Sequence, residues 1–249
     1  MRGIKIYIGS LRIEVHFTVA FLFLLAVLGA KVIFDSKIYE SGFVPEILMW
    51  AFGLVYAVGV IWSFLVHELS HYLVAKWFGG DAESVNLYFF GGFSVINLED
   101  SPGRIFLIMV AGPVSNLLLS LVFFAILSLT HLHFLQEEQI AIVTMRVLFW
   151  YLVKLNLILA VLNLIPAPPL DGGNALMSAL EFFKVGKIKS ATIALIATFI
   201  LFLIVLFFAF MTINPLLALS VFLFGLFCLS KAKKNLRNLR IEERISREK

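Results

Sequence analysis

The stretch Phe64–Trp77, which reads FLVHELSHYLVAKW, decides how the whole chain is interpreted. Two histidines, His67 and His71, stand four positions apart around Glu68, and an almost wholly apolar run precedes them. On a helix, side chains four residues apart differ by about 40° around the axis, so both imidazoles project from one face. The stretch therefore places a pair of metal-binding side chains at the end of a segment whose composition suits lipid.

Composition places the chain in a membrane. Of its 249 residues, 61% are hydrophobic and only 14% are charged, whereas soluble domains have about 45–50% apolar and about 25% charged residues. The single cysteine, Cys228, excludes an internal disulfide framework and a cluster of thiolate ligands. The net charge of +4 is concentrated at the C-terminus, and we expect no nucleic-acid partner.

Hydrophobic segments predict six transmembrane helices, because about 20 apolar residues cross a bilayer. The apolar stretch after the basic N-terminus is interpreted as the first of these helices and not as a removed signal peptide. The predicted fold class is an all-α polytopic membrane protein, a single integral-membrane domain over residues 1–249. The six spans are placed at residues 16–34, 47–77, 104–129, 146–165, 190–211 and 213–230.

Two segments interrupt the helical pattern. Glu83–Glu99 has β-rich runs on either side of Gly91 and Gly92, which predicts a small membrane-associated β-hairpin or sheet. Pro166–Gly173, PAPPLDGG, is predicted to be non-helical because prolines and glycines punctuate it, so the helix breaks there. A short amphipathic helix is expected to follow, from about Asn174 to Phe183.

Lysine and arginine positions predict the orientation. With six spans, both termini share one side of the membrane, and that side holds most of the basic residues, including a basic tail at residues 231–249. The opposite side holds only Lys31, Lys37 and Arg146. The positive-inside rule then places both termini in the cytoplasm. If Lys76 marks the interface, the two histidines lie roughly 8–14 Å below the cytoplasmic surface at 1.5 Å per residue.

Glu68 follows His67 directly, so it is turned by about 100° around a helix and stands beside the metal position. This arrangement suits a carboxylate that polarises a zinc-bound water, its role in H-E-x-x-H metalloproteases. The alternative is an interfacial histidine pair that hydrogen-bonds neighbouring helices. We favour the metal site, because ionisable side chains inside a membrane are costly and tend to be functional.

A catalytic zinc site needs a third protein ligand and an open position. His131 and His133 fall in the predicted loop on the far side of the membrane, which excludes them. His16 and Glu14 lie at the cytoplasmic end of the first span and remain candidates. Asp171 is the best choice, because it lies on the correct side in a broken helix that lets a carboxylate turn inward. Its alternative role is that of a plain turn aspartate, since Asp-Gly is a common turn pair.

Three ordered motifs carry a resemblance to a known family. HELSH (His67–His71), AGPVSN (Ala111–Asn116) and NLIPAPPLDGG (Asn163–Gly173) resemble the motifs of the site-2 protease family of intramembrane zinc metalloproteases. The resemblance covers nearly the whole chain and is similar to minimal archaeal and sporulation-type members, without PDZ or CBS domains. One departure is Ser70, where the family usually has glycine; serine is still small, so activity is expected to survive.

The resemblance implies one zinc ion per chain on His67, His71 and Asp171, with Glu68 as the general base. It also implies a catalytic core within residues 47–183. The expected function is cleavage of a peptide bond in or near a transmembrane segment of a membrane-anchored substrate, such as a transcription regulator or its inhibitor. The expected location is the cell membrane, with the bilayer as a partner; the oligomeric state stays unknown.

Several polar or flexible residues have supporting roles as candidates. Asn163 either packs helices together, holds the ligand loop or binds substrate, whereas helix packing is favoured for Asn116. The hairpin around Gly91 and Gly92 either accepts an unwound substrate strand by β-augmentation or forms a structural lid. Lys154, inside the fourth span, is expected to snorkel outward or face a polar cavity.

Two rival functions are considered. A membrane metalloprotease of the prenyl-protein or heat-shock type pairs the H-E-x-x-H motif with a downstream glutamate, here Glu83 or Glu99, and leaves the LDGG segment unexplained. A metal-ion transporter or channel uses the histidine pair as a transient ion site, and predicts further ligands on both sides of the membrane. The sequence gathers its polar groups on one side only, which favours the protease.

Overall fold

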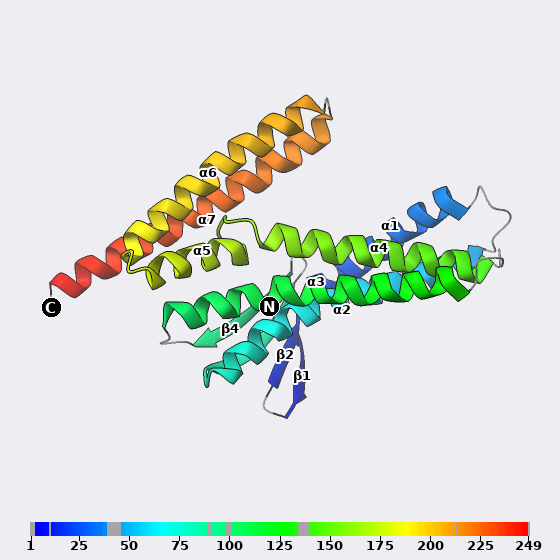
Figure 1. Cartoon of the computed structure of the whole chain (residues 1–249), viewed down its shortest axis with the longest axis horizontal. Coiled ribbons are helices and arrows are strands. Elements are labelled where there is room, and N and C mark those ends of the chain that lie inside the picture. The colour runs from blue at the N-terminus through cyan, green and yellow to red at the C-terminus, as the bar shows by residue number, and fades with distance from the viewer. Residues whose placement is uncertain are drawn as a thin grey trace. The chain divides into compact units, whose positions relative to one another are not determined.

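The computed structural model describes residues 3–9, 11–38, 46–88, 91–97, 101–133, 140–212 and 214–248 (Figure 1). Two compact units make up the chain. The first comprises Met1–Leu98 and Ala111–Ala160, and the second comprises Glu99–Val110 and Val161–Lys249. Two of the helices, α3 (Pro102–His133) and α4 (Ile140–Asn163), contribute residues to both units.

Long apolar helices dominate both units. In the first unit, α1 (Thr18–Ile38) packs against α2 (Glu46–Trp77). A core cluster joins these two helices to α4 through the buried residues Ala30, Met49, Leu148 and Leu152. The second unit contains three further helices, which are α5 (Asp171–Phe182), α6 (Lys187–Met211) and α7 (Pro215–Arg247).

Five of these helices are long and apolar enough to cross a membrane, namely α2, α3, α4, α6 and α7. The apolar part of α1 is shorter, Thr18–Val32. The described residues therefore support five of the six predicted spans, and the first predicted span is not among them. Its helix, α1, exists, but the apolar part of that helix is shorter than the roughly 20 residues that cross a bilayer.

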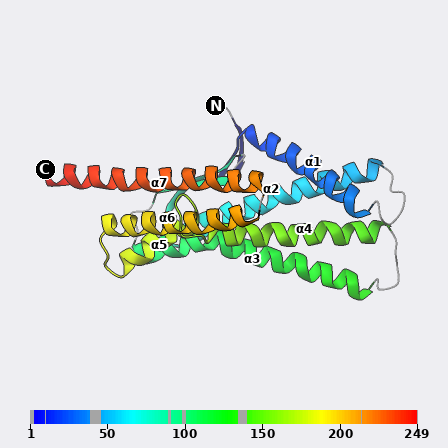
Figure 2. The same ribbon diagram turned by 90° about the horizontal axis from the view of Figure 1, so that it is seen from above.

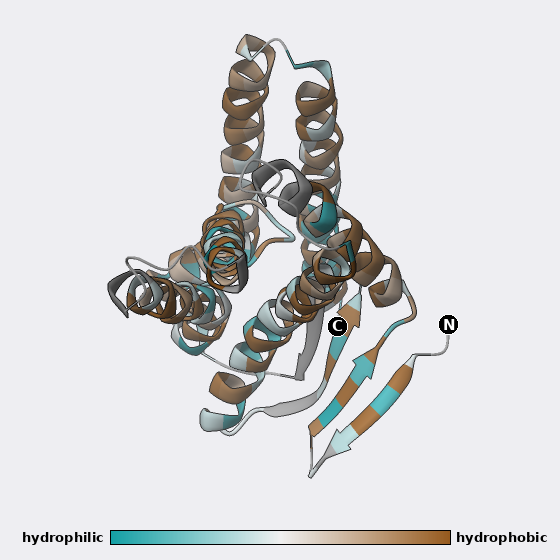
Figure 3. Cartoon of the chain, turned by 90° about the vertical axis from the view of Figure 1, so that its right-hand side faces the viewer, coloured by the Kyte–Doolittle hydropathy of each residue, from teal (hydrophilic) through white to brown (hydrophobic). Residues whose placement is uncertain are grey.

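Apolar side chains on the helix surfaces explain why a lipid environment is required. On α6, Phe207, Phe208 and Phe210 are 58%, 64% and 63% exposed. Figure 3 shows hydrophobic residues along most turns of the long helices. Exposed apolar patches of this kind are rare on soluble monomers and mark membrane or partner contact. The fold is that of a multi-pass membrane protein.

A small sheet accompanies α2 in the first unit. Its strands are β1 (Ile4–Ile8), β2 (Leu11–Val15), β3 (Asp81–Tyr88) and β4 (Gly91–Asn97), in that order across the sheet. The β1–β2 and β3–β4 pairs are antiparallel, whereas β2 and β3 run parallel. Both β3 and β4 contact α2, so the sheet lies against the helix that carries the histidines.

The predicted hairpin is confirmed as the β3–β4 pair, with Tyr88 opposite Gly91 and Leu87 opposite Gly92. Strands β1 and β2, which extend this hairpin into four strands, were not predicted from the sequence. The missed strands are short and alternate polar with apolar residues, as Figure 3 shows, and Glu14 of β2 pairs with Lys5 and Arg12.

The PAPPLDGG segment needs one correction. Pro166–Leu170 is non-helical, as predicted, but Asp171 is already the first residue of α5. Gly172 and Gly173 therefore belong to the first helical turn, where backbone N–H groups have no intrahelical acceptor and helix breakers are best tolerated. The predicted amphipathic helix exists as α5, and it begins at Asp171, three residues before the predicted start at Asn174.

The basic tail at residues 231–249 continues α7 as a helix up to Arg247. Figures 1 and 2 both show α6 and α7 side by side. Within the basic segment, Ala232 and Leu236 are buried, and the Asn235 amide reaches the Met177 sulfur of α5 at 3.5 Å. The segment is therefore anchored on one face, although its lysines and arginines are mostly exposed.

Leu236→Ala tests this anchoring, with Ile241→Ala as the matched control, since Leu236 is 7% exposed and Ile241 is 49% exposed. Truncating the buried leucine is expected to cost about 2 kcal/mol or more, whereas the control is expected to stay within about 0.5 kcal/mol of the wild type. Thermal unfolding in detergent measures both. Equal shifts in the two variants would contradict the packing of the basic segment.

Candidate metal centre

The histidine pair lies on the buried face of α2. His67 and His71 are 6% and 4% exposed. Their Nε2 atoms are 3.3 Å apart, and the two rings are nearly perpendicular, at 83°. In a tetrahedral zinc site with Zn–N distances near 2.0–2.1 Å, two nitrogen ligands are about 3.3 Å apart. The pair thus has the spacing that two ligands of one zinc ion require.

Gly112 of α3 is the residue that allows another helix to approach the pair. A Cβ atom at this position would lie 2.7 Å from both Cε1 and Nε2 of His67, and would also collide with Nε2 of His71. Any side chain here would occupy the space that the imidazoles, or an ion between them, need. The close approach of α3 at Gly112 is therefore made against the histidines.

Asn116, one helical turn further along α3, is fully buried and contacts His67. Its Oδ1 lies 2.5 Å from His67 Nδ1. An amide oxygen can only accept a hydrogen bond, so Nδ1 carries the proton and Nε2 keeps its lone pair toward His71. A metal-binding histidine usually donates its other N–H in this way. Helix packing was the role predicted for Asn116, and the structure adds this contact with His67.

Glu68 and Asp171 are the acidic residues of the candidate site. Glu68 is 7% exposed on α2, and Asp171 is the first residue of α5. One ligand atom from each of His67, His71 and Asp171 lies within 4.8 Å of the others, a set able to hold a metal ion. Among the residues that the structure describes, this is the one group of three or more histidine, cysteine, aspartate and glutamate side chains so placed.

The two glycines that follow Asp171 are packed tightly against the segment between α4 and α5. A Cβ atom on Gly172 would collide with the carbonyl of Leu164, and one on Gly173 would collide with the backbone nitrogen of Pro168. The segment between α4 and α5 therefore folds back so closely that only glycine fits at these two positions. This packing accounts for the two glycines of the LDGG sequence independently of any role in metal binding.

The other histidines lie elsewhere. His16 Nδ1 is 3.0 Å from Thr18 Oγ1, and its ring is 5.1 Å from that of Tyr88; it does not belong to the metal-ligating group found among the described residues. His131 and His133 are at the end of α3. His131 is 15 residues beyond Asn116, which is about 22 Å along a helix.

The remaining predicted residues have identifiable positions. Asn163 is the last residue of α4 and is partly buried. Gly91 and Gly92 pair with β3 at the start of β4.

The Ser70 hydroxyl donates to the carbonyl of Val66 at 2.7 Å, so its own helix satisfies the extra polar group. Lys154 lies over the rings of Trp150 and Tyr151, with its Nζ 4.7 Å and 5.5 Å from their centroids.

Sequence reasoning missed two buried polar residues near the site, Ser63 and Asn156. Both are fully buried, and Asn156 Oδ1 accepts from the Asn116 amide at 2.9 Å. The signal for Asn156 was present, because it is an amide inside an apolar span, as Asn116 and Asn163 are. Ser63 carried no such signal, since serine is common on helices in membranes.

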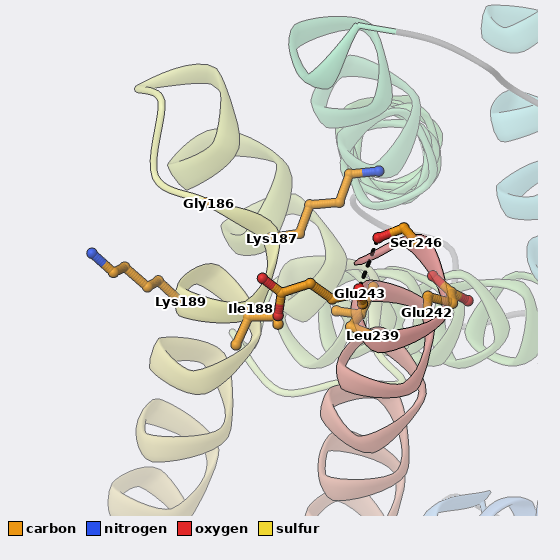
Figure 4. A pocket seen from close by; sticks show the side chains of 8 residues that line it. All are labelled: Gly186, Lys187, Ile188, Lys189, Leu239, Glu242, Glu243 and Ser246. Atoms are coloured by element: carbon orange, nitrogen blue, oxygen red, sulfur yellow. Dashed lines mark hydrogen bonds between the residues drawn. The ribbon is translucent and has the colours of Figure 1, made fainter. Parts of the chain in front are cut away.

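A cavity of about 630 Å³ lies in the second unit, where α6 begins and α7 ends (Figure 4). Its charged lining residues include Lys187, Lys189, Glu242 and Glu243, and the two lysines point in opposite directions in Figure 4. Burial raises the pKa of the nearby Glu181 carboxyl, against the opposing effect of Lys187. No histidine lines this cavity, so it is not a second site of the same kind.

A polytopic membrane fold with a buried H-E-x-x-H pair defines a class of membrane metalloprotein. The profile of Peptidase family M50 matches residues 55–137 and 130–208, and the chain belongs to this family. A solved structure, the site-2 protease from Methanocaldococcus jannaschii, is similar with a TM-score of 0.57 and 28% identity; the match covers 94% of this chain and 95% of that one. The predicted family resemblance is confirmed.

Curated relatives point the same way. A zinc metalloprotease from Methanocaldococcus jannaschii is 29% identical over 223 residues, which is 90% of this chain and 53% of the relative. The candidate zinc metalloprotease Rip3 of Mycobacterium tuberculosis is 37% identical over 137 residues, 55% of this chain and 33% of its own. The chain thus spans about half of the first relative's length and about a third of the second's. Their names and the ligand set both indicate zinc as the cofactor.

Gly112→Ala tests the packing of α3 against the histidines. The added methyl group would collide with both rings, so zinc content after purification is expected to fall well below one ion per chain. Gly29→Ala is the control, because a Cβ atom at Gly29 meets nothing within 4 Å. Elemental analysis measures zinc in both variants. Full zinc content in Gly112→Ala would show that the rings do not need this space.

Proposed function

We propose that the chain is an intramembrane zinc endopeptidase that cleaves a peptide bond in or near a transmembrane segment of a membrane-anchored protein. The observation that carries this proposal is the convergence of His67 and His71 Nε2 atoms, 3.3 Å apart, on a helix apolar enough to span a membrane. Membership of Peptidase family M50 supports the reaction class. A site on a membrane-spanning helix acts on substrates that lie in the same bilayer.

His67, His71 and Asp171 would hold the zinc ion, and their three donors leave one coordination position open for water or substrate. When bound, zinc supplies Lewis acidity toward a water molecule and toward the scissile carbonyl. Asp171 is supported as the third ligand by the 4.8 Å limit on the ligand atoms. Asn163, eight residues before Asp171, is proposed to hold the ligand segment or bind substrate backbone.

Glu68 is proposed as the general base. It takes a proton from the attacking water and later gives it to the leaving amine, as a positioned carboxylate does in general acid–base catalysis. Because Glu68 directly follows His67, its side chain is turned by about 100° around the helix axis, so it stands beside the metal ligands and is not one of them. Its burial at 7% exposure keeps the reacting proton away from bulk water.

The site is proposed to open toward the cytoplasm, with both termini on that side. Support comes from the distribution of Lys and Arg under the positive-inside rule. In this orientation the histidines lie roughly 8–14 Å below the surface at 1.5 Å per residue, and the cleaved substrate releases a cytoplasmic fragment. A transcription regulator or its inhibitor is the kind of substrate that such a release would activate.

A substrate helix must unwind before its peptide bonds can be cut, because its carbonyls are hydrogen-bonded within the helix. We propose that β4, an edge strand of the four-stranded sheet, accepts the unwound segment by β-augmentation. Gly91 and Gly92 stand at the start of this strand, and β4 contacts the helix that carries the histidines. The sheet would thereby align the substrate beside the metal-binding residues.

A metal-ion transporter is not favoured. Transport requires several ligand groups along a path, whereas the described part of the chain contains one group of three metal-binding side chains. The glutamate-ligand type of metalloprotease is likewise less well supported, because the third side chain of that group is Asp171. Glu99, one of its two candidate glutamates, lies outside the described residues.

Glu68→Gln is expected to lower the cleavage rate by at least about 100-fold, the usual contribution of a general base. Zinc content should stay near one ion per chain, because Glu68 is not proposed as a ligand. Glu46→Gln on the same helix is the control, since Glu46 pairs with Lys31 in the first turn. The assay is cleavage of co-expressed membrane-anchored regulators. Undiminished cutting by Glu68→Gln would rule out this mechanism.

Asp171→Ala is expected to lose both cleavage and zinc, because two histidines alone hold the ion weakly. Asp171→Asn gives a milder test, since it keeps the shape of the side chain and removes its charge. Zinc analysis of the purified variants and the same cleavage assay measure the result. Zinc retained at the wild-type level in both variants would move the third ligand elsewhere, first to His16.

A further inference from the structure

A chain of buried hydrogen bonds leads from His67 away from the metal position into the first unit. Asn116 Oδ1 faces His67 Nδ1, and the Asn116 amide donates to Asn156 Oδ1 at 2.9 Å. The Asn156 amide in turn donates to Ser63 Oγ at 3.0 Å and to the Leu152 carbonyl at 2.9 Å. The chain connects three helices, α2, α3 and α4, through polar groups.

Two backbone carbonyls set the direction of this chain. The Ser63 hydroxyl donates to the carbonyl of Gly59 at 2.8 Å, so its oxygen is left to accept from Asn156. The Leu152 carbonyl can only accept. Both N–H groups of Asn156 are therefore used, and its oxygen must be the atom that faces Asn116. If the donor and acceptor ends of the Asn156 side chain were exchanged, its oxygen would face the Ser63 oxygen and the Leu152 carbonyl, which are both acceptors.

The orientation of the Asn116 side chain is fixed in the same way. Its NH₂ group donates to Asn156 Oδ1 and, at 3.4 Å, to the carbonyl of Ser63. If the amide were flipped, its oxygen would face both of these acceptors, and its NH₂ group would face His67. In the observed orientation the Asn116 oxygen accepts from Nδ1–H. His67 is then held in the tautomer whose Nε2 carries a lone pair.

Burial makes the orientation difficult to change. Ser63, Asn116 and Asn156 are each 0% exposed. No water from outside is at hand to replace a lost partner, and a buried polar group left unpaired is costly. A network of this kind that is fully connected holds its members in one arrangement. The chain thus restrains a metal-binding ring from the side opposite to the metal.

We propose that Asn156 is a positioning residue for the metal centre. It acts through Asn116, fixes the tautomer and ring orientation of His67, and thereby raises the affinity of the site for zinc. Ser63 and the Leu152 carbonyl are its anchors. The inference rests on the proposed zinc site but not on proteolysis, because its consequences are measured in metal binding and in the state of the ring.

The main test measures zinc affinity by competition with a chelator, on purified protein in detergent. Asn156→Leu keeps the approximate size of the side chain and removes both hydrogen-bonding groups. We expect it to weaken zinc binding by about 10- to 100-fold, the usual effect of losing a partner behind a metal ligand. Ser63→Ala, which removes one of the two acceptors of the Asn156 amide, is expected to give a smaller loss in the same direction.

Ser120→Ala is the matched control. The Ser120 hydroxyl of α3 donates to the carbonyl of Val153 on α4 at 3.1 Å, and it is buried. This hydrogen bond joins α3 to α4, as the Asn116–Asn156 bond does, but it is not part of the series of hydrogen bonds that leads to His67. The control should lose some thermal stability and keep wild-type zinc affinity. Equal losses of affinity in Ser120→Ala and Asn156→Leu would reduce Asn156 to a packing residue.

A double variant separates action through Asn116 from a general structural effect. In an Asn116→Ala background, Asn156→Leu should cause no further loss of zinc affinity, because the connection to His67 is already broken. Losses that add instead would overturn the proposal, since independent effects are additive. Proteolytic activity is measured in parallel; if the double-variant result holds while the wild type cuts no substrate, the proposed protease function fails and this inference stands.

The decisive part of a second measurement is made on the wild-type protein and does not depend on any variant of Asn156 being folded. Nitrogen chemical shifts of histidine rings report which nitrogen carries the proton. In metal-free wild-type protein with labelled histidine at alkaline pH, His67 should be the Nδ1–H tautomer, with its signal assigned by comparison with His67→Gln. Asn156→Leu should show a mixture of tautomers. An Nε2–H tautomer in the wild type would overturn the proposal directly.

Discussion

The convergence of two imidazoles on one buried face of α2 is the constraint on which the rest of the site depends. The Nε2 atoms of His67 and His71 are 3.3 Å apart, close enough to share one ion. Helical periodicity alone brings the two rings to the same face. Holding them at this distance requires a small residue opposite them, which is Gly112. On the other side of His67, the Asn116 oxygen accepts a hydrogen bond from the ring Nδ1–H and thereby orients the ring.

A lipid setting raises the importance of these arrangements. In a hydrocarbon environment a polar group without a partner is expensive, because no water is available to replace the lost hydrogen bond. The polar side chains around His67 therefore form a connected chain through Asn116, Asn156 and Ser63. Outside this region the helices expose apolar side chains, as α6 does with its phenylalanines. Polarity is concentrated where the chemistry is proposed to occur.

Several parts of the fold were predictable from the sequence for local physical reasons. The long apolar runs predicted α2, α3, α4, α6 and α7, and the Gly91-Gly92 pair predicted the β3–β4 hairpin. Errors arose where local signals are weak. Strand β2 pairs with β3, which is distant in sequence, and β1 pairs with β2. Asp171 begins a helix despite the glycines after it, because a first turn tolerates them.

The sequence by itself determined the membrane class, the shared face of His67 and His71, and Asp171 as the carboxylate to consider beside them. These follow from composition and from the helical period, which act over a few residues. Only the tertiary structure decided that Asn116 meets His67 across 49 positions, and that Asn156 meets Ser63 across 93. Such contacts depend on how whole helices are packed against one another, and no local pattern in the chain records that packing.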